Sequence, residues 1–84
     1  MEAVIDDERM LANIASNLRA LLTDRDWSLR ELSRATSIPL MTLSNLANEK
    51  HVPGVIALAK IAEALRTTVD YLLTDHSEKS SPAA

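Results

Sequence analysis

The chain has 84 residues, no cysteine, one glycine and a formal net charge of −3. The length allows one small domain, and the missing cysteines exclude a disulfide framework and a thiolate metal site. The sequence contains no run of 18 apolar residues, so no membrane span is predicted. The N-terminal MEAVIDDERM is acidic, whereas a signal peptide begins with basic residues. We therefore expect a cytoplasmic protein without metal or cofactor. Abundant leucine and alanine, with no alternation of apolar and polar residues, predict an all-α fold.

Charge is unevenly distributed along the chain. Residues 1–8 carry four acidic side chains and no basic one, whereas residues 9–73 carry eight basic and six acidic side chains. The acidic start also suits the positive end of a helix dipole, which is a structural explanation for it. The middle of the chain is mildly basic without a dense basic patch. We therefore expect weak non-specific attraction to phosphates.

The first predicted helix runs from about Asp7 to Asp24. Its apolar residues recur at helical spacing and define one buried face. The residues of this face are Leu11, Ile14, Ala15, Leu18, Leu21 and Leu22.

The second predicted helix, Leu29 to about Thr36, has the clearest start signal in the chain. Ser28 and Glu31 have the spacing of a capping box, in which Ser28 caps the helix and Glu31 reaches back to the Ser28 amide. Trp27 and Leu32 have the spacing of a hydrophobic staple, so we interpret Trp27 as a packing residue.

A short third helix is predicted from about Pro39 to Asn48. Pro39 disfavours helical geometry at Ile38 and suits the first turn of a new helix. The inward face is expected to contain Leu43, Leu46 and Ala47. The opposite face is expected to contain Met41, Ser44, Asn45 and Asn48, with Leu40 and Thr42 beside it.

The remainder of the chain predicts a loop, two helices and a tail. Pro53-Gly54 marks a loop, and a fourth helix follows from about Val55 to Leu65. Thr68 is expected to cap a last helix, Val69 to Leu73. The apolar face of the fourth helix is Val55, Leu58, Ile61, Ala62 and Leu65. We divide the chain into an acidic extension (1–7), one domain (8–74) and a disordered tail or linker start (75–84).

Two short helices joined by a few residues within a five-helix domain predict a helix-turn-helix, whose second helix presents its N-terminal residues to the major groove of DNA. An ordered set of residues matches one family. The set is Ile14, Leu18, Arg19 and Leu21; Trp27, Ser28, Glu31 and Leu32; Ile38, Thr42, Leu43, Ser44 and Leu46; Pro53; Leu58, Ile61, Ala62, Ala64 and Leu65; and Val69 to Leu73. The chain thereby resembles the lambda-repressor and Cro type (XRE-type) helix-turn-helix DNA-binding domain over most of its length.

The resemblance implies three groups of functional residues. Base-edge contacts fall on Leu40, Met41, Thr42 and Asn45. DNA-backbone contacts fall on Arg19, Ser28, Ser44, Asn48 and Lys50, and we add Arg30 because phosphate contacts come from the second helix in such folds. Dimer contacts fall on Val69, Tyr71 and Leu72.

The chemistry of the base-reading residues indicates an A·T-leaning site. Asn45 has the side chain that pairs in two-point fashion with adenine, and Leu40 and Met41 suit thymine methyl groups. Two further interpretations of Leu40 and Met41 stay open, namely packing inside the protein and a patch for a protein partner.

Several positions depart from the family pattern. Leu29 stands where the family often has a glutamine that touches a phosphate, and Leu22 stands where a basic residue is common. Ser37 and Arg66 stand where glycine is usual, so we expect left-handed backbone at both. Arg30 and Arg34 form either a solvated face or a surface near the DNA backbone, and His51 is interpreted as a solvated loop residue.

An enzyme is not expected. The sequence has no cysteine nucleophile, no Ser-His-Asp arrangement, no glycine-rich phosphate loop and room for no large pocket. We expect a transcriptional repressor that binds a palindromic double-stranded DNA operator as a homodimer. The alternative is a helix-turn-helix used as an antirepressor-like or antitoxin-like protein-binding module through Leu40 and Met41. A third interpretation makes the chain the N-terminal part of a longer repressor.

Overall fold

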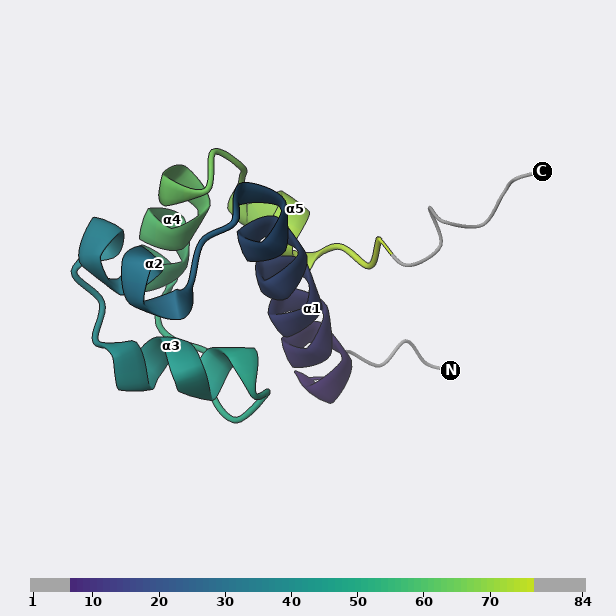
Figure 1. Ribbon diagram of the computed structural model, residues 1–84. Coiled ribbons are helices and arrows are strands. Elements are labelled where there is room, and N and C mark those ends of the chain that lie inside the picture. The colour runs from purple at the N-terminus through teal and green to yellow at the C-terminus, as the bar shows by residue number, and fades with distance from the viewer. Residues whose placement is uncertain (1–6, 77–84) are drawn as a thin grey trace, which may run out of the picture.

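The computed structural model describes residues 7–76, which form five α-helices without strands. The helices are α1 (Asp7–Arg25), α2 (Leu29–Thr36), α3 (Leu40–Ala47), α4 (Val55–Ala64) and α5 (Val69–Leu73). The long α1 lies beside α5, while α2, α3 and α4 form the other half of the domain (Figure 1). The predicted all-α, five-helix fold is confirmed.

The predicted helix starts are confirmed in detail. The Ser28 amide donates to the Glu31 carboxylate at 2.7 Å, and the Glu31 amide donates to the Ser28 hydroxyl at 3.2 Å, which completes the capping box of α2. The Tyr71 amide donates to the Thr68 hydroxyl at 3.0 Å, so Thr68 caps α5. One detail differs, because Pro39 is the N-cap of α3 and the helix begins one residue later.

Four helices are followed, within two residues of their last residue, by a residue in the left-handed backbone region that is not glycine. The φ angles are 58° at Asp26, 64° at Ser37, 60° at Glu49 and 59° at Arg66. The left-handed backbone predicted at Ser37 and Arg66 is confirmed, and Asp26 and Glu49 add two positions that the sequence did not predict. After Glu49, the Lys50 amide donates to the Asn45 carbonyl at 2.7 Å, and this bond closes the end of α3.

One apolar core joins all five helices. Its buried members are Ile14, Leu18, Leu21, Leu22, Leu32, Ile38, Leu43, Leu46, Ala47, Leu58, Ile61, Ala62, Leu65 and Leu72. The predicted inward faces of the first and third helices are confirmed, and Trp27 packs against this core as predicted. The prediction for Val55 is wrong, because this side chain is 72% exposed. Val55 opens α4, and a helical side chain leans toward the N-terminus, so at this position it extends beyond the packed turns.

A buried polar side chain joins α1 to α5. Asn17 is 7% exposed, and its amide nitrogen donates to the carbonyls of Tyr71, Leu72 and Thr74 at 3.1, 2.8 and 2.8 Å. Carbonyls at the end of a helix lack partners within the helix. Asn17 therefore supplies a buried donor to carbonyls at the C-terminal end of α5, a role that no local signal in the sequence indicates.

Most of the predicted acidic extension (1–7) and of the predicted tail (75–84) lies outside the described residues, which are 7–76. His76 lies in the segment predicted as the tail, but its side chain packs on α5. Its ring stacks on Tyr71 with centroids 3.8 Å apart, and its Nε2 lies 2.9 Å from the Tyr71 carbonyl oxygen. Within residues 7–76, no helix has the length and apolar character needed to cross a bilayer.

Candidate nucleic-acid interface

The turn between α2 and α3 is fixed by side chains. Thr36 is buried, donates to the Leu32 carbonyl at 2.8 Å and accepts the Ile38 amide at 3.2 Å. Ser33 donates to the Ile38 carbonyl at 2.6 Å. These bonds, together with the left-handed Ser37, satisfy the polar groups of the turn while Ile38 enters the core. The turn therefore holds the start of α3 at a set place relative to α2, as a helix-turn-helix requires.

The two faces of α3 differ as predicted. Leu43, Leu46 and Ala47 are buried. On the other face, Met41 is 71% exposed and Leu40 is 38% exposed. The interpretation that places Met41 inside the protein is therefore wrong.

The polar residues of α3 complete its outward surface. Thr42, Ser44 and Asn45 are half-buried, and Asn48 is exposed at the end of the helix. The Asn48 amide group donates to the Ser44 hydroxyl at 3.3 Å, so these two predicted backbone-contact residues also contact each other. The structure thus gathers all the base-reading candidates, with Ser44 and Asn48, on one short surface free of charged side chains.

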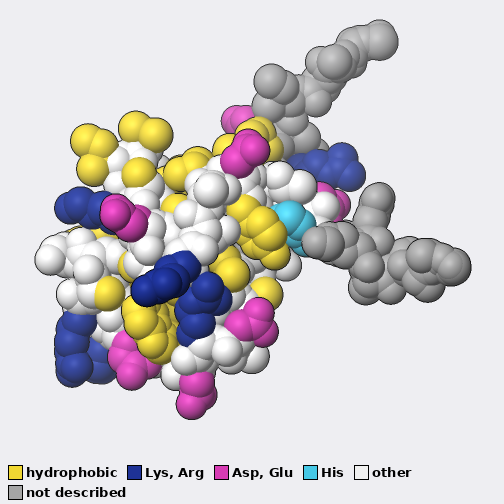
Figure 2. All heavy atoms as spheres, turned by 90° about the horizontal axis from the view of Figure 1, so that it is seen from above, with side chains coloured by type: hydrophobic (Ala, Val, Ile, Leu, Met, Phe, Trp, Pro, Cys, Tyr) yellow, Lys and Arg dark blue, Asp and Glu magenta, His cyan; other side chains and the backbone are white. Residues whose placement is uncertain are grey.

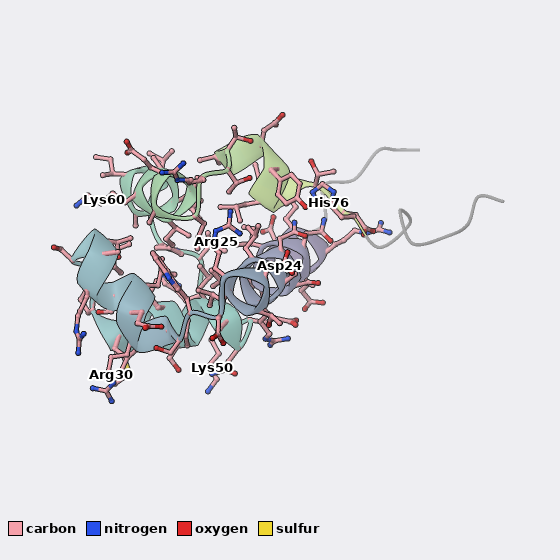
Figure 3. All side chains as sticks on the ribbon, turned by 45° about the horizontal axis from the view of Figure 1, so that its top comes forward. Asp24, Arg25, Arg30, Lys50, Lys60 and His76 are labelled. Atoms are coloured by element: carbon pink, nitrogen blue, oxygen red, sulfur yellow. The ribbon has the colours of Figure 1, made fainter. Side chains whose placement is uncertain are left out.

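Basic side chains flank this surface. Arg30, at the start of α2, and Lys50, in the loop after α3, extend away from the body of the protein toward the lower edge of Figure 3, whereas Lys60 of α4 lies on another side. Arg34 and His51 are also exposed. Arg30 and Lys50 thus lie on the same side of the molecule in this view.

Acidic side chains stand next to both cations. Glu31 adjoins Arg30 in the chain, and Glu49 adjoins Lys50. The face seen from above in Figure 2, which carries α4 and α5, likewise mixes Lys and Arg with Asp and Glu. The weak attraction to phosphates that the sequence predicted stays a prediction, and these acidic neighbours are consistent with it.

The start of α2 is partly occupied by its own cap. The Ser28 hydroxyl accepts the Glu31 amide, and the Ser28 amide donates to the Glu31 carboxylate. A helix N-terminus attracts anions through its free N–H groups and its dipole. Here one carboxylate already lies at this end, so a phosphate would meet the remaining N–H groups of the first turn beside a negative charge.

Arg19 is exposed, and its side chain also has a partner within the protein. Its guanidinium donates to the carbonyl of Ala47, the last residue of α3. The structure therefore places this predicted backbone-contact residue between α1 and the end of α3. Sequence reasoning missed this contact, because the two residues lie 28 positions apart and no local pattern links them.

The predicted dimer residues differ in accessibility. Tyr71 is 38% exposed and Val69 is half-buried. Leu72 has no exposed surface and belongs to the core. The prediction of a dimer contact at Leu72 is therefore corrected, because Leu72 is the buried core residue of α5.

Two exposed features were not predicted. Ile56, beside Val55 at the start of α4, is 71% exposed, which puts two large aliphatic side chains next to each other at the surface.

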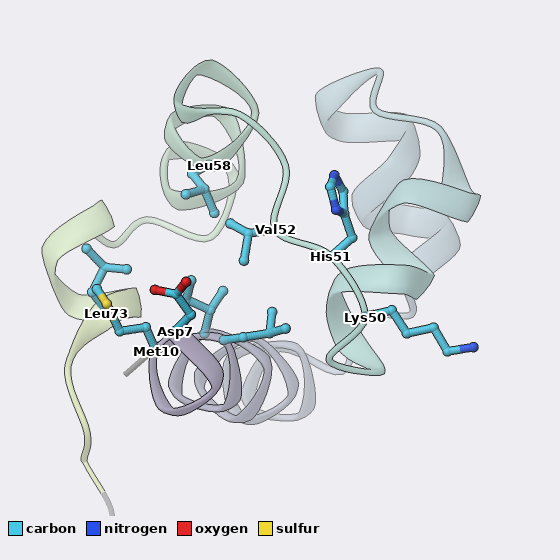
Figure 4. Close-up of a pocket in the computed structure, with 9 residues that line it drawn as sticks. Asp7, Met10, Lys50, His51, Val52, Leu58 and Leu73 are labelled. Carbon is cyan, nitrogen blue, oxygen red and sulfur yellow. The ribbon is translucent and has the colours of Figure 1, made fainter. Parts of the chain in front are cut away.

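An open depression of about 570 Å³ lies between the start of α1, the loop after α3, and Leu58 and Leu73 (Figure 4). Its lining is mostly apolar and Lys50 points away from it. The expectation that the chain has room for no large pocket is wrong in this respect. Among residues 7–76 no acidic, histidine or cysteine group is arranged to hold a metal ion.

The geometry is that of a helix-turn-helix, and comparison with known proteins agrees. The family model described as Helix-turn-helix matches residues 18–72. A crystal structure of the hypothetical transcription factor NHTF from Neisseria is similar, with a TM-score of 0.80 and 23% sequence identity, over 94% of this chain and 89% of that one. No curated protein sequence gives a significant match.

The chain belongs to the helix-turn-helix family, since the matched residues span most of its length. The match begins within α1 and ends within α5, so it contains α2, α3 and α4 in full. The resemblance inferred from the sequence is thereby confirmed at the level of family and fold.

Proposed function

We propose that the protein is a sequence-specific DNA-binding transcriptional regulator that acts as a repressor in the cytoplasm. The observation that carries the proposal is the outward surface of α3. A fixed turn precedes it, its inward face is buried, and its outward side chains have the chemistry to contact base edges. In a helix-turn-helix this is the helix that enters the major groove.

Base reading is assigned to the exposed first turns of α3. Asn45 is half-buried, so its side chain is held near the protein surface where it can make two hydrogen bonds to adenine. Leu40 and Met41, exposed at the start of the helix, suit thymine methyl groups, and Thr42 lies beside them. The preferred half-site is therefore rich in A·T pairs.

Phosphate contacts are assigned to residues around the ends of α2 and α3. These are Ser28, Arg30, Ser44, Asn48 and Lys50. With Arg30 and Lys50 as the cations among them, the salt dependence should correspond to few phosphates per domain, with a slope of about −0.9 for each phosphate neutralised. Such a domain gains useful affinity only when two copies act together.

A homodimer on a palindromic operator supplies that second copy. Tyr71 and Val69 on α5 are the accessible members of the predicted dimer surface. Two domains related by a two-fold axis bind half-sites about one helical turn apart. Occupying a promoter in this way blocks transcription without any further surface, which is why repression is proposed.

Selection of bound fragments from random duplex DNA tests the proposal. An enriched palindrome with A·T-rich half-sites, bound more weakly with rising salt and at least tenfold more weakly by Asn45→Ala, supports it. Lys60→Ala is the matched control, because Lys60 lies on α4 away from α3 and its loss should leave binding nearly unchanged. Enrichment of no sequence at low salt, or an equal effect of both variants, would refute it.

A protein-binding function is the second candidate. The observation that favours it is the combination of a 71% exposed Met41 with an α3 that contains no charged residue. An apolar contact to a protein partner should persist at high salt, whereas DNA binding should weaken steeply. Salt titration of any bound partner therefore separates the two functions.

A further inference from the structure

The C-terminal end of α3 depends on a residue of α1. The last four carbonyls of a helix have no partner within it. In α3, the Ser44, Asn45 and Leu46 carbonyls accept the amides of residues 48, 50 and 49 at 2.9, 2.7 and 3.0 Å. The fourth carbonyl, that of Ala47, accepts the Arg19 guanidinium. Arg19 thus completes the closure of this helix end.

The two ends of α3 are held by different neighbours. The turn that contains Thr36 and Ser37 ties its start to α2. Its end is tied to α1 by the bond from Arg19, next to the buried Ala47. A cation also interacts favourably with the negative end of a helix dipole. Because both ends are held, the orientation of α3 relative to α1 and α2 is fixed.

We propose that Arg19 is a positioning residue for DNA reading and not a phosphate contact. The inference rests on the proposed function, because it assumes that α3 reads bases. With its guanidinium on the Ala47 carbonyl, Arg19 orients α3 so that Asn45 and Met41 meet their bases together. This replaces the backbone-contact role that the sequence resemblance implied for Arg19.

The two roles predict different salt behaviour. A lost phosphate contact weakens binding to all sequences alike and reduces the salt slope by about 0.9. A lost positioning bond weakens binding to the selected operator. Binding to unrelated DNA and the salt dependence of the affinity stay unchanged. We expect Arg19→Gln to bind the operator roughly tenfold more weakly, which is the size of one good base contact.

The test compares Arg19→Gln, Arg19→Lys and Arg30→Gln by titration of operator and scrambled duplex at several salt concentrations. Arg30→Gln is the matched control, since it makes the same chemical change on the exposed surface of α2. We expect it to lower the slope with either duplex. Arg19→Lys keeps a cationic donor on a long side chain for the Ala47 carbonyl, whereas Gln is shorter and neutral, so Arg19→Lys should recover most of the operator affinity. A reduced slope in Arg19→Gln, or an unchanged operator affinity, would overturn the proposal.

A second measurement needs no DNA and covers the case in which the protein selects none. Amide resonances of residues 44–50 are compared between the wild-type protein and the Arg19 variants. Displaced resonances along α3 in Arg19→Gln, with smaller displacements in Arg19→Lys, support positioning by Arg19. Unchanged resonances in a folded Arg19→Gln overturn it. Should Arg19→Gln fail to fold, the side-chain signal of Arg19 in the wild-type protein decides, because a phosphate contact would shift it on addition of duplex and a positioning bond would not.

Failure of the DNA function has a different signature. In that case the wild-type protein enriches no duplex, whatever the resonances of α3 show. If the positioning role fails, the wild-type protein still binds its operator. Arg19→Gln then has the same operator affinity as the wild-type protein, or its affinity has a reduced salt dependence. The two outcomes are therefore distinguishable.

Discussion

Replacing Arg66 with glycine should stabilise the protein. Arg66 follows α4 in the left-handed backbone region with φ of 59°, and its side chain is exposed. This conformation costs a residue other than glycine roughly 1–2 kcal/mol. Glycine loses about 0.5–1 kcal/mol more conformational entropy on folding. We therefore expect Arg66→Gly to raise the free energy of unfolding by about 0.5–1 kcal/mol, the middle of the range that the difference between these two terms spans.

The hydrogen bonds at this helix end should survive the change. The amides of Arg66 and Thr67 donate to the carbonyls of Glu63 and Ala62 at 3.1 and 2.8 Å, and glycine keeps the amide. In a domain of this size, 1 kcal/mol shifts the melting temperature by about 4–8 °C. The expected rise in melting temperature is therefore about 2–8 °C.

Urea and thermal unfolding followed by circular dichroism measure the effect, with two controls. Arg66→Ala removes the same side chain but keeps the backbone cost, so its stability should stay close to that of the wild-type protein. Lys60→Gly places glycine inside α4, where it should lower stability by about 1 kcal/mol. If Arg66→Gly is no more stable than Arg66→Ala, the reasoning from backbone conformation is refuted.

Three further changes test other parts of the structure. Ser28→Ala removes the side-chain half of the capping box and should lower the free energy of unfolding by about 1 kcal/mol in urea titrations; an unchanged midpoint would contradict the cap. Asn17→Ala leaves carbonyls at the end of α5 without their buried donor, so we expect a loss of about 1–3 kcal/mol and faster hydrogen exchange in α5; retained protection there would count against this role. Met41→Ala should change stability by less than about 0.5 kcal/mol, because the side chain is largely exposed, while operator affinity falls; equal affinity would remove Met41 from the base-reading surface.

The helices could be predicted because their start signals are local. Ser28 with Glu31, Pro39 and Thr68 each mark a helix start within a few residues. Spacing alone was insufficient for Val55, because a periodic pattern does not say whether the first turn of a helix has a neighbour to pack against. The left-handed backbone at Glu49 was likewise not predicted, since no glycine or other local signal marks it.

The candidate site could be predicted only in outline. Its location on α3 followed from the order of the helices. Helical spacing placed Met41 on the outward face but left packing inside the protein open, because an apolar residue at the start of a short helix fits a core and a binding surface equally well. The partner of Arg19 and the burial of Leu72 depend on how α1 packs against α3 and α5, and such contacts between distant residues leave no periodic trace in a single sequence.

The most direct test of the DNA-reading role of α3 is a nuclear magnetic resonance titration of the labelled protein with the duplex obtained by selection. We predict that the largest amide shifts fall on residues 40–50 and on the start of α2 at Ser28 to Arg30, with little change along α4. Large shifts confined to α4, α5 or the apolar depression beside α1, with α3 unaffected, would contradict the account.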